Sequence, residues 1–139
     1  MPWSGHIFVA DADISRNVSH SSATAYNTRT LSGVIAHEIT HELIVHHLGL
    51  LRAVRLPSCV VEGYCDYIAR ESSFSEEKGM QLVARGEEDS SASFNYFVDR
   101  KMITHLLETK GYSFDQVVAH VGDATAIRIE TLARLRSGR

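Results

Sequence analysis

The stretch that decides the fold is residues 31–50, LSGVIAHEITHELIVHHLGL. Its apolar residues recur at the three- and four-residue spacing of an α-helix, at Leu31, Val34, Ile35, Ile39, Leu43, Ile44 and Leu48. Gly49 follows as an expected C-terminal stop, because glycine readily adopts the backbone conformation that ends helices. The spacing predicts one helix from about Thr30, with HEITHE at residues 37–42 inside it.

The two histidines of this helix lie one turn apart. Positions i and i+4 differ by about 40° around an α-helix, so His37 and His41 face the same way. Two neutral imidazoles at that spacing can bind one Zn²⁺, with Glu38 beside its open side. Zinc lowers the pKa of a bound water to about 7, and Glu38 is then the expected general base rather than a ligand.

A catalytic zinc site needs a third protein ligand, and two residues are candidates, His47 and Glu62. His47 is placed like the last histidine of the pattern H-E-x-x-H-x-x-G-x-x-H, but Ile44 stands where that pattern needs glycine to turn the chain back. On a continuing helix His47 lies about 80° from His37 and more than two turns along, out of reach of a shared ion. We therefore expect His46 and His47 to be surface or helix-end groups.

Glu62 is the preferred third ligand, because it falls on the next predicted helix after a linker that lets that helix fold back. The alternative is a surface glutamate near a helix start, where the helix dipole favours acids. Asp66 follows on the same face, where a carboxylate can accept the free N–H of a metal-bound histidine and fix its tautomer. Asp66 would hold His37, with His41 as the alternative.

Further helices are predicted along the chain. SCVVEGYCDYIARES, after a linker ending at Pro57, predicts a helix with Ser58 as its N-cap, although Gly63 weakens it. Helical patterns continue over about 75–85, 93–111, 113–121 and 124–136, with a polar loop at 86–93. Ser113 and Gln116 form an expected capping box.

Strand content is expected to be small. HIFVADADI, residues 6–14, alternates and is rich in β-branched residues, which predicts one strand; a second short strand is expected around 23–26. At 139 residues the chain suits one domain. We predict an α+β, mainly helical fold over 1–139, with a strand and loop region at 1–30 and the helical part at 31–139.

Composition excludes several classes of protein. With 22% charged residues and a net charge of −3, and with scattered basic residues, a nucleic-acid partner is not expected. The N-terminus lacks the pattern of a secretory signal, and no apolar run is long enough to cross a bilayer. A cytoplasmic location is the default expectation, although a fragment of a longer secreted or membrane-attached chain would look the same. Cys59 and Cys65 are expected to be buried free thiols.

HEITH, followed after twenty residues by EGYCD, resembles the gluzincins, zinc metallopeptidases with two histidines and a glutamate as ligands, and most of all their small peptidase-MA-like branch. The resemblance covers about 31–70 and, less specifically, 96–111. It implies Zn²⁺ held by His37, His41 and Glu62, with Glu38 as base and Asp66 behind a histidine ligand. It also implies a zincin-like fold whose sheet presents an edge strand to a peptide, and HIFVADADI is the expected edge strand or its neighbour among the two or three short strands for which there is room. Val61 stands where the thermolysin group often has an asparagine, so the closest resemblance is not to thermolysin itself.

Gluzincins also place a downstream tyrosine or histidine near the reacting carbonyl. Tyr96 is the first choice for this oxyanion role, and the alternative is that it is a core residue of an amphipathic helix. Arg100, one turn on, is expected to bind a substrate carboxylate or to pair with an acid. The weaker candidates are His105, Tyr112 and His120.

Two functions stay open. The first is a zinc peptidase that hydrolyses peptide bonds in a peptide or protein substrate. The second is an inactive or truncated zincin-like module that binds zinc and a partner, which the 36 residues before His37 favour because they leave little room for a sheet. A deformylase-like amide hydrolase is disfavoured, because that family takes a cysteine ligand from upstream and both cysteines here lie downstream. Substrate preference and oligomeric state do not follow from the sequence, and neither does the native metal, since such sites accept several ions.

Overall fold

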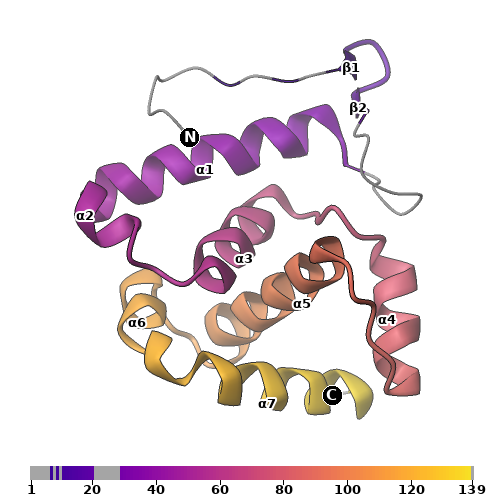
Figure 1. Ribbon diagram of the computed structural model, residues 1–139, viewed down its shortest axis with the longest axis vertical. Helices are drawn as coiled ribbons and strands as arrows, with labels where there is room; N and C mark the ends of the chain where they lie inside the picture. The colour runs from indigo at the N-terminus through magenta and orange to yellow at the C-terminus, as the bar shows by residue number, and fades with distance from the viewer. Residues whose placement is uncertain (1–6, 8, 10, 21–28, 139) are drawn as a thin grey trace.

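The computed structural model describes residues 7, 9, 11–20 and 29–138, and these are mainly helical with one small antiparallel sheet (Figure 1). The helices are α1 (Leu31–Leu48), α2 (Leu50–Ala53), α3 (Ser58–Ala69), α4 (Glu76–Arg85), α5 (Ala92–Thr104), α6 (Phe114–Ala119) and α7 (Ala124–Arg136). A π-helical turn, His105–Thr109, continues α5, and a 3₁₀ turn, Val121–Asp123, precedes α7. The prediction of an α+β, mainly helical fold is confirmed at this level.

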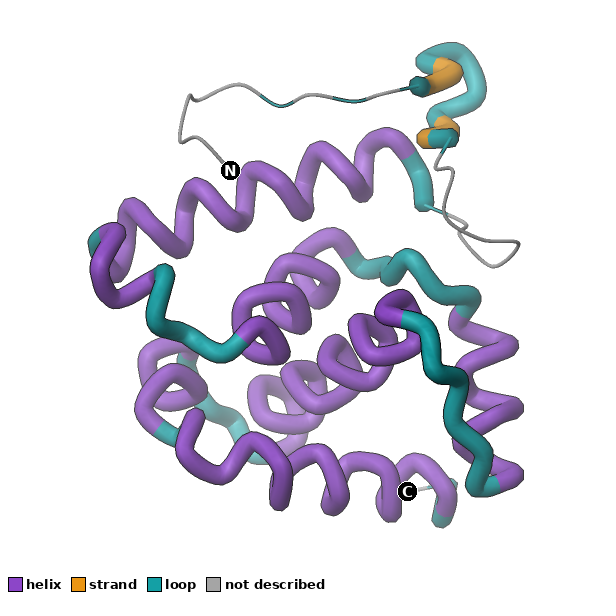
Figure 2. Tube along the Cα trace, viewed as in Figure 1, coloured by secondary structure: helices purple, strands orange, loops and turns teal. Residues whose placement is uncertain are grey.

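The sheet is smaller than predicted. It consists of β1 (Ala12–Asp13) and β2 (Val18–Ser19), paired Ala12 to Ser19 and Asp13 to Val18 beside the start of α1 (Figure 2). The strand predicted over 6–14 is therefore confirmed only at Ala12–Asp13, and it is wrong for the remaining described residues of that range. Ser15 Oγ and the Arg16 N–H both donate to the Asp13 carboxylate, which closes a turn directly after β1. The second strand, predicted at 23–26, lies outside the described residues.

The helix that carries HEITHE matches its prediction closely. Thr30 is the N-cap of α1, and its side chain accepts a hydrogen bond from the Gly33 N–H. Gly49 ends the helix with φ at +78°, a conformation that favours glycine, so the predicted stop is confirmed. The short helix α2 was not predicted, because one turn is too short to show a period.

The predicted N-cap of the next helix is wrong by one residue. Pro57 is the N-cap of α3 and Ser58 is its first helical residue, with no side-chain capping bond. α3 ends at Arg70, which has φ at +61°. α4, α6 and α7 lie within the predicted ranges, with Ser75 capping α4 and Ser113 and Gln116 forming the predicted capping box of α6. α5 begins at Ala92, one residue before its predicted range and inside the predicted loop, because Ser91 caps it by accepting from the Phe94 N–H.

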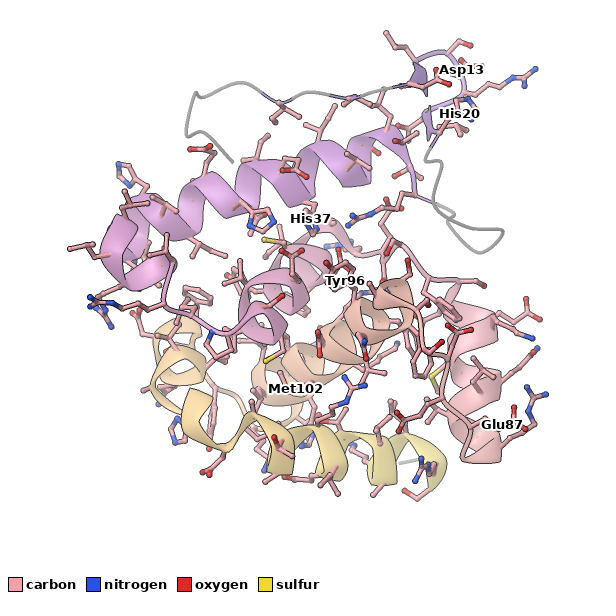
Figure 3. The ribbon with its side chains drawn as sticks, viewed as in Figure 1. Asp13, His20, His37, Glu87, Tyr96 and Met102 are labelled. Carbon is pink, nitrogen blue, oxygen red and sulfur yellow. The ribbon has the colours of Figure 1, made fainter. Side chains whose placement is uncertain are left out.

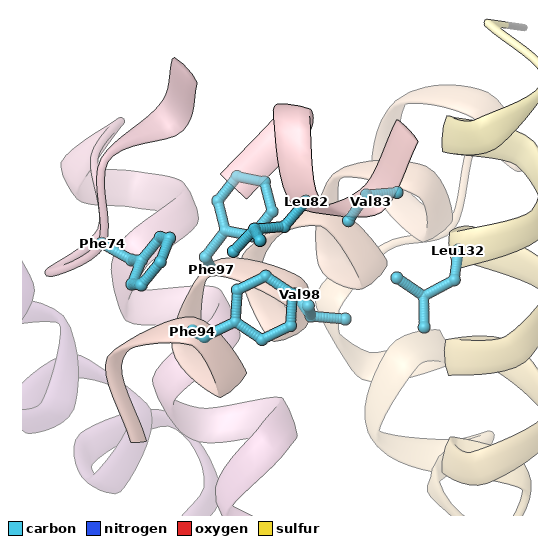
Figure 4. Packing of buried hydrophobic residues seen from close by; sticks show 7 residues of the cluster. All are labelled: Phe74, Leu82, Val83, Phe94, Phe97, Val98 and Leu132. Atoms are coloured by element: carbon cyan, nitrogen blue, oxygen red, sulfur yellow. The ribbon is translucent and has the colours of Figure 1, made fainter. Parts of the chain in front are cut away.

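The helices pack in successive rows, with α1 above α3, α3 above α5, and α7 beyond α5 (Figure 1). One buried cluster joins α4, α5 and α7 around the rings of Phe94 and Phe97 (Figure 4). A second lies between α3, α5 and α6 around Met102 and Ile103. Gly63 lets α3 and α5 approach closely, because a Cβ there would stand 2.7 Å from the Asp99 carbonyl oxygen. The glycine that weakened the helix prediction is thus a packing residue.

Both cysteines are free thiols, as predicted. Cys65 is fully buried under α1, whereas Cys59, near the start of α3, is only half-buried. Among the described helices, none is long and apolar enough to cross a membrane.

Candidate metal centre

The start of α1 is fixed by hydrogen bonds to residues outside the helix. The first four amides of a helix lack partners within it, and here all four find acceptors on Asn17 or Thr30. They are the N–H groups of Leu31, Ser32, Gly33 and Val34. Glu71, from the loop after α3, accepts from the Thr30 N–H at 2.9 Å and from Thr30 Oγ1 at 3.1 Å. These contacts hold the register of α1 against α3.

His37 and His41 point together from α1 toward α3 (Figure 3 labels His37). Their Nε2 atoms lie 3.1 Å apart. The Glu62 carboxylate, on α3, lies 3.3 Å from Nε2 of His37 and 3.7 Å from Nε2 of His41. Bonds of about 2.0–2.2 Å to one tetrahedral zinc would separate its ligands by roughly 3.3–3.5 Å. The three predicted ligands therefore converge with spacings that a single ion can bridge.

Asp66 lies behind His37, on the side away from Glu62. The Nδ1 atom of His37 is 2.7 Å from Oδ1 of Asp66, and the Asp66 side chain is only 1% exposed. An Nδ1–H that donates to this carboxylate leaves the Nε2 lone pair free and directed toward Glu62 and His41. This is the tautomer that a metal ligand needs.

The charges of the centre are strongly coupled. Burial lowers the pKa of His37, but hydrogen bonds to Asp66 and Glu62 raise it more, so the net pKa lies above its ordinary value. Burial raises the pKa of Glu62, but the His37 hydrogen bond and the charges of both histidines outweigh it and lower the net pKa. The pKa of His41 is lowered, mainly by burial. The same hydrogen-bond acceptors that favour a proton on His37 would favour a cation placed between Nε2 of His37 and the Glu62 carboxylate.

Cys65 is a fourth potential donor that the sequence did not identify. Ligand atoms of Cys65, His37 and His41 lie within 4.8 Å of one another. Burial, followed by the charges of Glu62 and Asp66, raises the pKa of the Cys65 thiol well above its usual range, so the thiol stays neutral. The Glu62 carboxylate, whose lowered pKa keeps it ionised, lies 3.3 and 3.7 Å from the two Nε2 atoms, whereas the neutral thiol would have to lose its proton before it could bind zinc.

Glu38 and Tyr96 lie near the same centre. The Glu38 side chain is half-buried, and its charge raises the pKa of both His41 and Cys65. Tyr96, near the start of α5, has a pKa raised by burial and then by the charges of Glu62 and Asp66 (Figure 3). Both predicted residues are therefore within electrostatic range of the ligands.

The residues considered as alternatives lie elsewhere. His47 is exposed and pairs with Asp115 at 2.8 Å, and His46 is exposed too, so the expectation of helix-end surface groups is confirmed. His105 contacts Glu130, and His120 stacks near Tyr112, both far along the chain from the ligands. Arg100 pairs with Glu76 at 3.2 Å, which is one of its two expected roles.

Arg29 is the other residue that sequence reasoning missed. Its guanidinium donates to Asp66 Oδ1 and lies 2.9 Å from His37 Nδ1. It precedes α1, so it shares no helical spacing with the motif. The sequence predicts an acid, Asp66, behind His37. A buried carboxylate needs a positively charged partner, and this need is the signal that could have pointed to a nearby arginine.

An apolar groove of about 310 Å³ lies on another face of the α1–α3 pair. Its described lining includes Leu43, Ile44, Tyr64, Ile68 and Phe114. Tyr64 and Ile68 lie about 200–240° around α3 from Glu62, and His37, His41 and Glu62 are not among the described residues that line the groove. It is not the cleft of this site.

Comparison of the chain with protein-family models, with curated proteins and with solved structures finds no match.

Proposed function

We propose that this protein is a small zinc-dependent peptidase of the zincin-like type. The single observation that supports it most is the convergence of His37, His41 and Glu62, with separations of 3.1, 3.3 and 3.7 Å between their donor atoms. Two imidazoles and one carboxylate suit zinc better than magnesium or calcium, which prefer oxygen ligands.

Zinc, when bound, supplies a Lewis acid that polarises a substrate carbonyl and makes a water molecule acidic. Glu38 takes the proton from the attacking water and delivers it to the leaving amine. Its place one residue after His37 puts it beside the ligands without competing for the ion. The Tyr96 hydroxyl donates a hydrogen bond to the oxyanion that develops on the carbonyl. Asp66 keeps His37 in the tautomer that presents Nε2.

The second candidate is a zinc-binding module without turnover. The observation that favours it is the sheet, which in the described part of the chain has only two-residue strands. So short an edge offers few main-chain hydrogen bonds to a peptide. Under this reading the same ligands hold zinc, and the ion stabilises the α1–α3 pair.

One pair of variants separates the two functions. Zinc-loaded wild type and Glu38→Ala would be compared on a mixed peptide library, with bound zinc measured by elemental analysis. The peptidase predicts a loss of at least about a hundredfold in kcat/KM for Glu38→Ala, with zinc still near one per chain. Glu42→Ala, on the same helix, is the matched control and should cleave like wild type. A zinc-loaded wild type that cleaves nothing, or an equally active Glu38→Ala, would rule out the peptidase.

A further inference from the structure

We propose that Arg29 is a positioning residue of the metal centre, whose guanidinium holds Asp66 and, through Asp66, the ring of His37. The inference rests on the proposed metal site, and it adds a residue that neither the motif nor the ligand spacing includes.

The three side chains contact one another, since Nη2 of Arg29 also lies 2.9 Å from Nδ1 of His37. Oδ1 of Asp66 accepts from both Arg29 and His37, and the side chains of Arg29 and Asp66 are 14% and 1% exposed. Asp66 Oδ2 and Arg29 Nε are buried and have no hydrogen-bond partner among the described residues. Arg29 is thus the cation that compensates the charge of a carboxylate almost closed to water. A carboxylate this deeply buried requires such a partner.

The backbone of Arg29 is held at its own carbonyl and at the residue that follows it. Its carbonyl accepts from the Ser19 N–H at 3.3 Å, and the next residue, Thr30, is bound by Glu71 and bridged to Val18 of β2. A guanidinium on an anchored backbone loses less entropy when it binds Asp66. The hairpin and the Glu71 loop therefore contribute to the metal centre through Arg29.

Two opposing effects follow from removal of the guanidinium. Its positive charge repels a nearby metal cation, so its loss favours binding. However, Arg29 and Asp66 form a pair with no net charge, which limits this repulsion at the ligands. Loss of the counter-ion leaves a buried carboxylate that turns toward water and releases the His37 ring. Partners that orient metal-bound histidines typically contribute 10- to 100-fold in metal affinity, and we expect this loss to dominate.

The test is the zinc dissociation constant of the whole chain, measured by competition with a chromophoric chelator. Arg29→Met should weaken zinc binding about tenfold, and Arg29→Lys should recover part of the loss because it keeps the charge without the planar fork. In an Asp66→Asn background, Arg29→Met should cause little further loss, because both act through one contact. In ¹⁵N NMR, the His37 Nδ1–H should exchange with water faster in Arg29→Met than in wild type.

Arg128→Met is the matched control, since Arg128 pairs with another buried acid, Asp99, at 3.2 Å, and its hydrogen bonds among the described residues go to Asp99 and Asn95 and to none of the three ligands. Its zinc affinity should equal that of wild type. An unchanged or tighter zinc Kd in Arg29→Met, or losses that add fully in the double variant, would overturn the inference while leaving the peptidase proposal intact. A wild type that binds zinc but cleaves no peptide would overturn the peptidase proposal, and the zinc Kd values of the variants would still decide whether Arg29 positions the centre. A wild type that binds no zinc would overturn both.

Discussion

Gly33 makes room for the contact that fixes the start of α1. A Cβ at this position would overlap the Glu71 carboxylate and stand 2.9 Å from its Cγ. Gly33→Ala should therefore expel that carboxylate and break its two hydrogen bonds to Thr30. Losing two bonds to a charged, partly exposed group costs about 2–4 kcal/mol, and the helix propensity of alanine returns up to about 1 kcal/mol. The net loss in unfolding free energy is about 1–3 kcal/mol.

Urea denaturation of the metal-free chain measures this loss, and a second background tests its cause. In Glu71→Ala the clash no longer exists, so adding Gly33→Ala should change the sign of the effect and stabilise by up to about 1 kcal/mol. Gly122→Ala is the control, because a Cβ there meets nothing within 4 Å. Equal destabilisation by Gly33→Ala in both backgrounds would refute the assigned role of Glu71.

The remaining predictions concern the centre and one buried acid. Cys65→Ala should leave the zinc affinity within about twofold of wild type, as measured by chelator competition. Loss of a true ligand, or of a residue that hydrogen-bonds to a ligand, typically lowers the affinity tenfold or more. Tyr96→Phe should lower kcat about a hundredfold with zinc content unchanged, and an unchanged kcat would remove Tyr96 from the oxyanion role. Burial raises the pKa of Asp99 to about 6, against the opposing charge of Arg128. The folded state then holds this proton more tightly than the unfolded chain, so the contribution of Asp99 is fully present below about pH 4 and is lost as pH rises through about 6. In urea denaturation, the unfolding free energy of Asp99→Asn relative to that of wild type should rise by up to about 3 kcal/mol between pH 4 and pH 7. A difference between the two proteins that is the same at both pH values would contradict the raised pKa of Asp99.

Local pattern predicted most of the helices and the residues that converge with His37 and His41. α1 has a long apolar period and a glycine stop, and α6 has a reciprocal capping box, so the boundaries follow from nearby residues. Glu62 and Asp66 could be predicted because a helix places residues four apart on one face. In the structure, that face of α3 lies against His37 and His41 of α1. Periodicity carries that information without knowledge of the tertiary fold.

Features without local periodicity were missed. α2 is a single turn, and the Pro57 cap differs from the expected Ser58 because proline already holds the extended backbone that precedes a helix. Arg29 reaches Asp66 across 37 residues of sequence, and Glu71 reaches Thr30 across 41. Such contacts depend on how α1 and α3 pack, which no spacing within either segment encodes.

The claim that His37, His41 and Glu62 hold zinc is tested most directly by zinc X-ray absorption on the purified, metal-loaded chain. We predict a first shell of nitrogen and oxygen only, at about 2.0–2.2 Å, with the scattering pattern of two imidazoles. Glu62→Ala should lose the carboxylate contribution or the zinc itself, whereas Cys65→Ala should leave the spectrum unchanged. A sulfur neighbour at about 2.3 Å, or an unchanged spectrum in Glu62→Ala, would contradict the proposed centre.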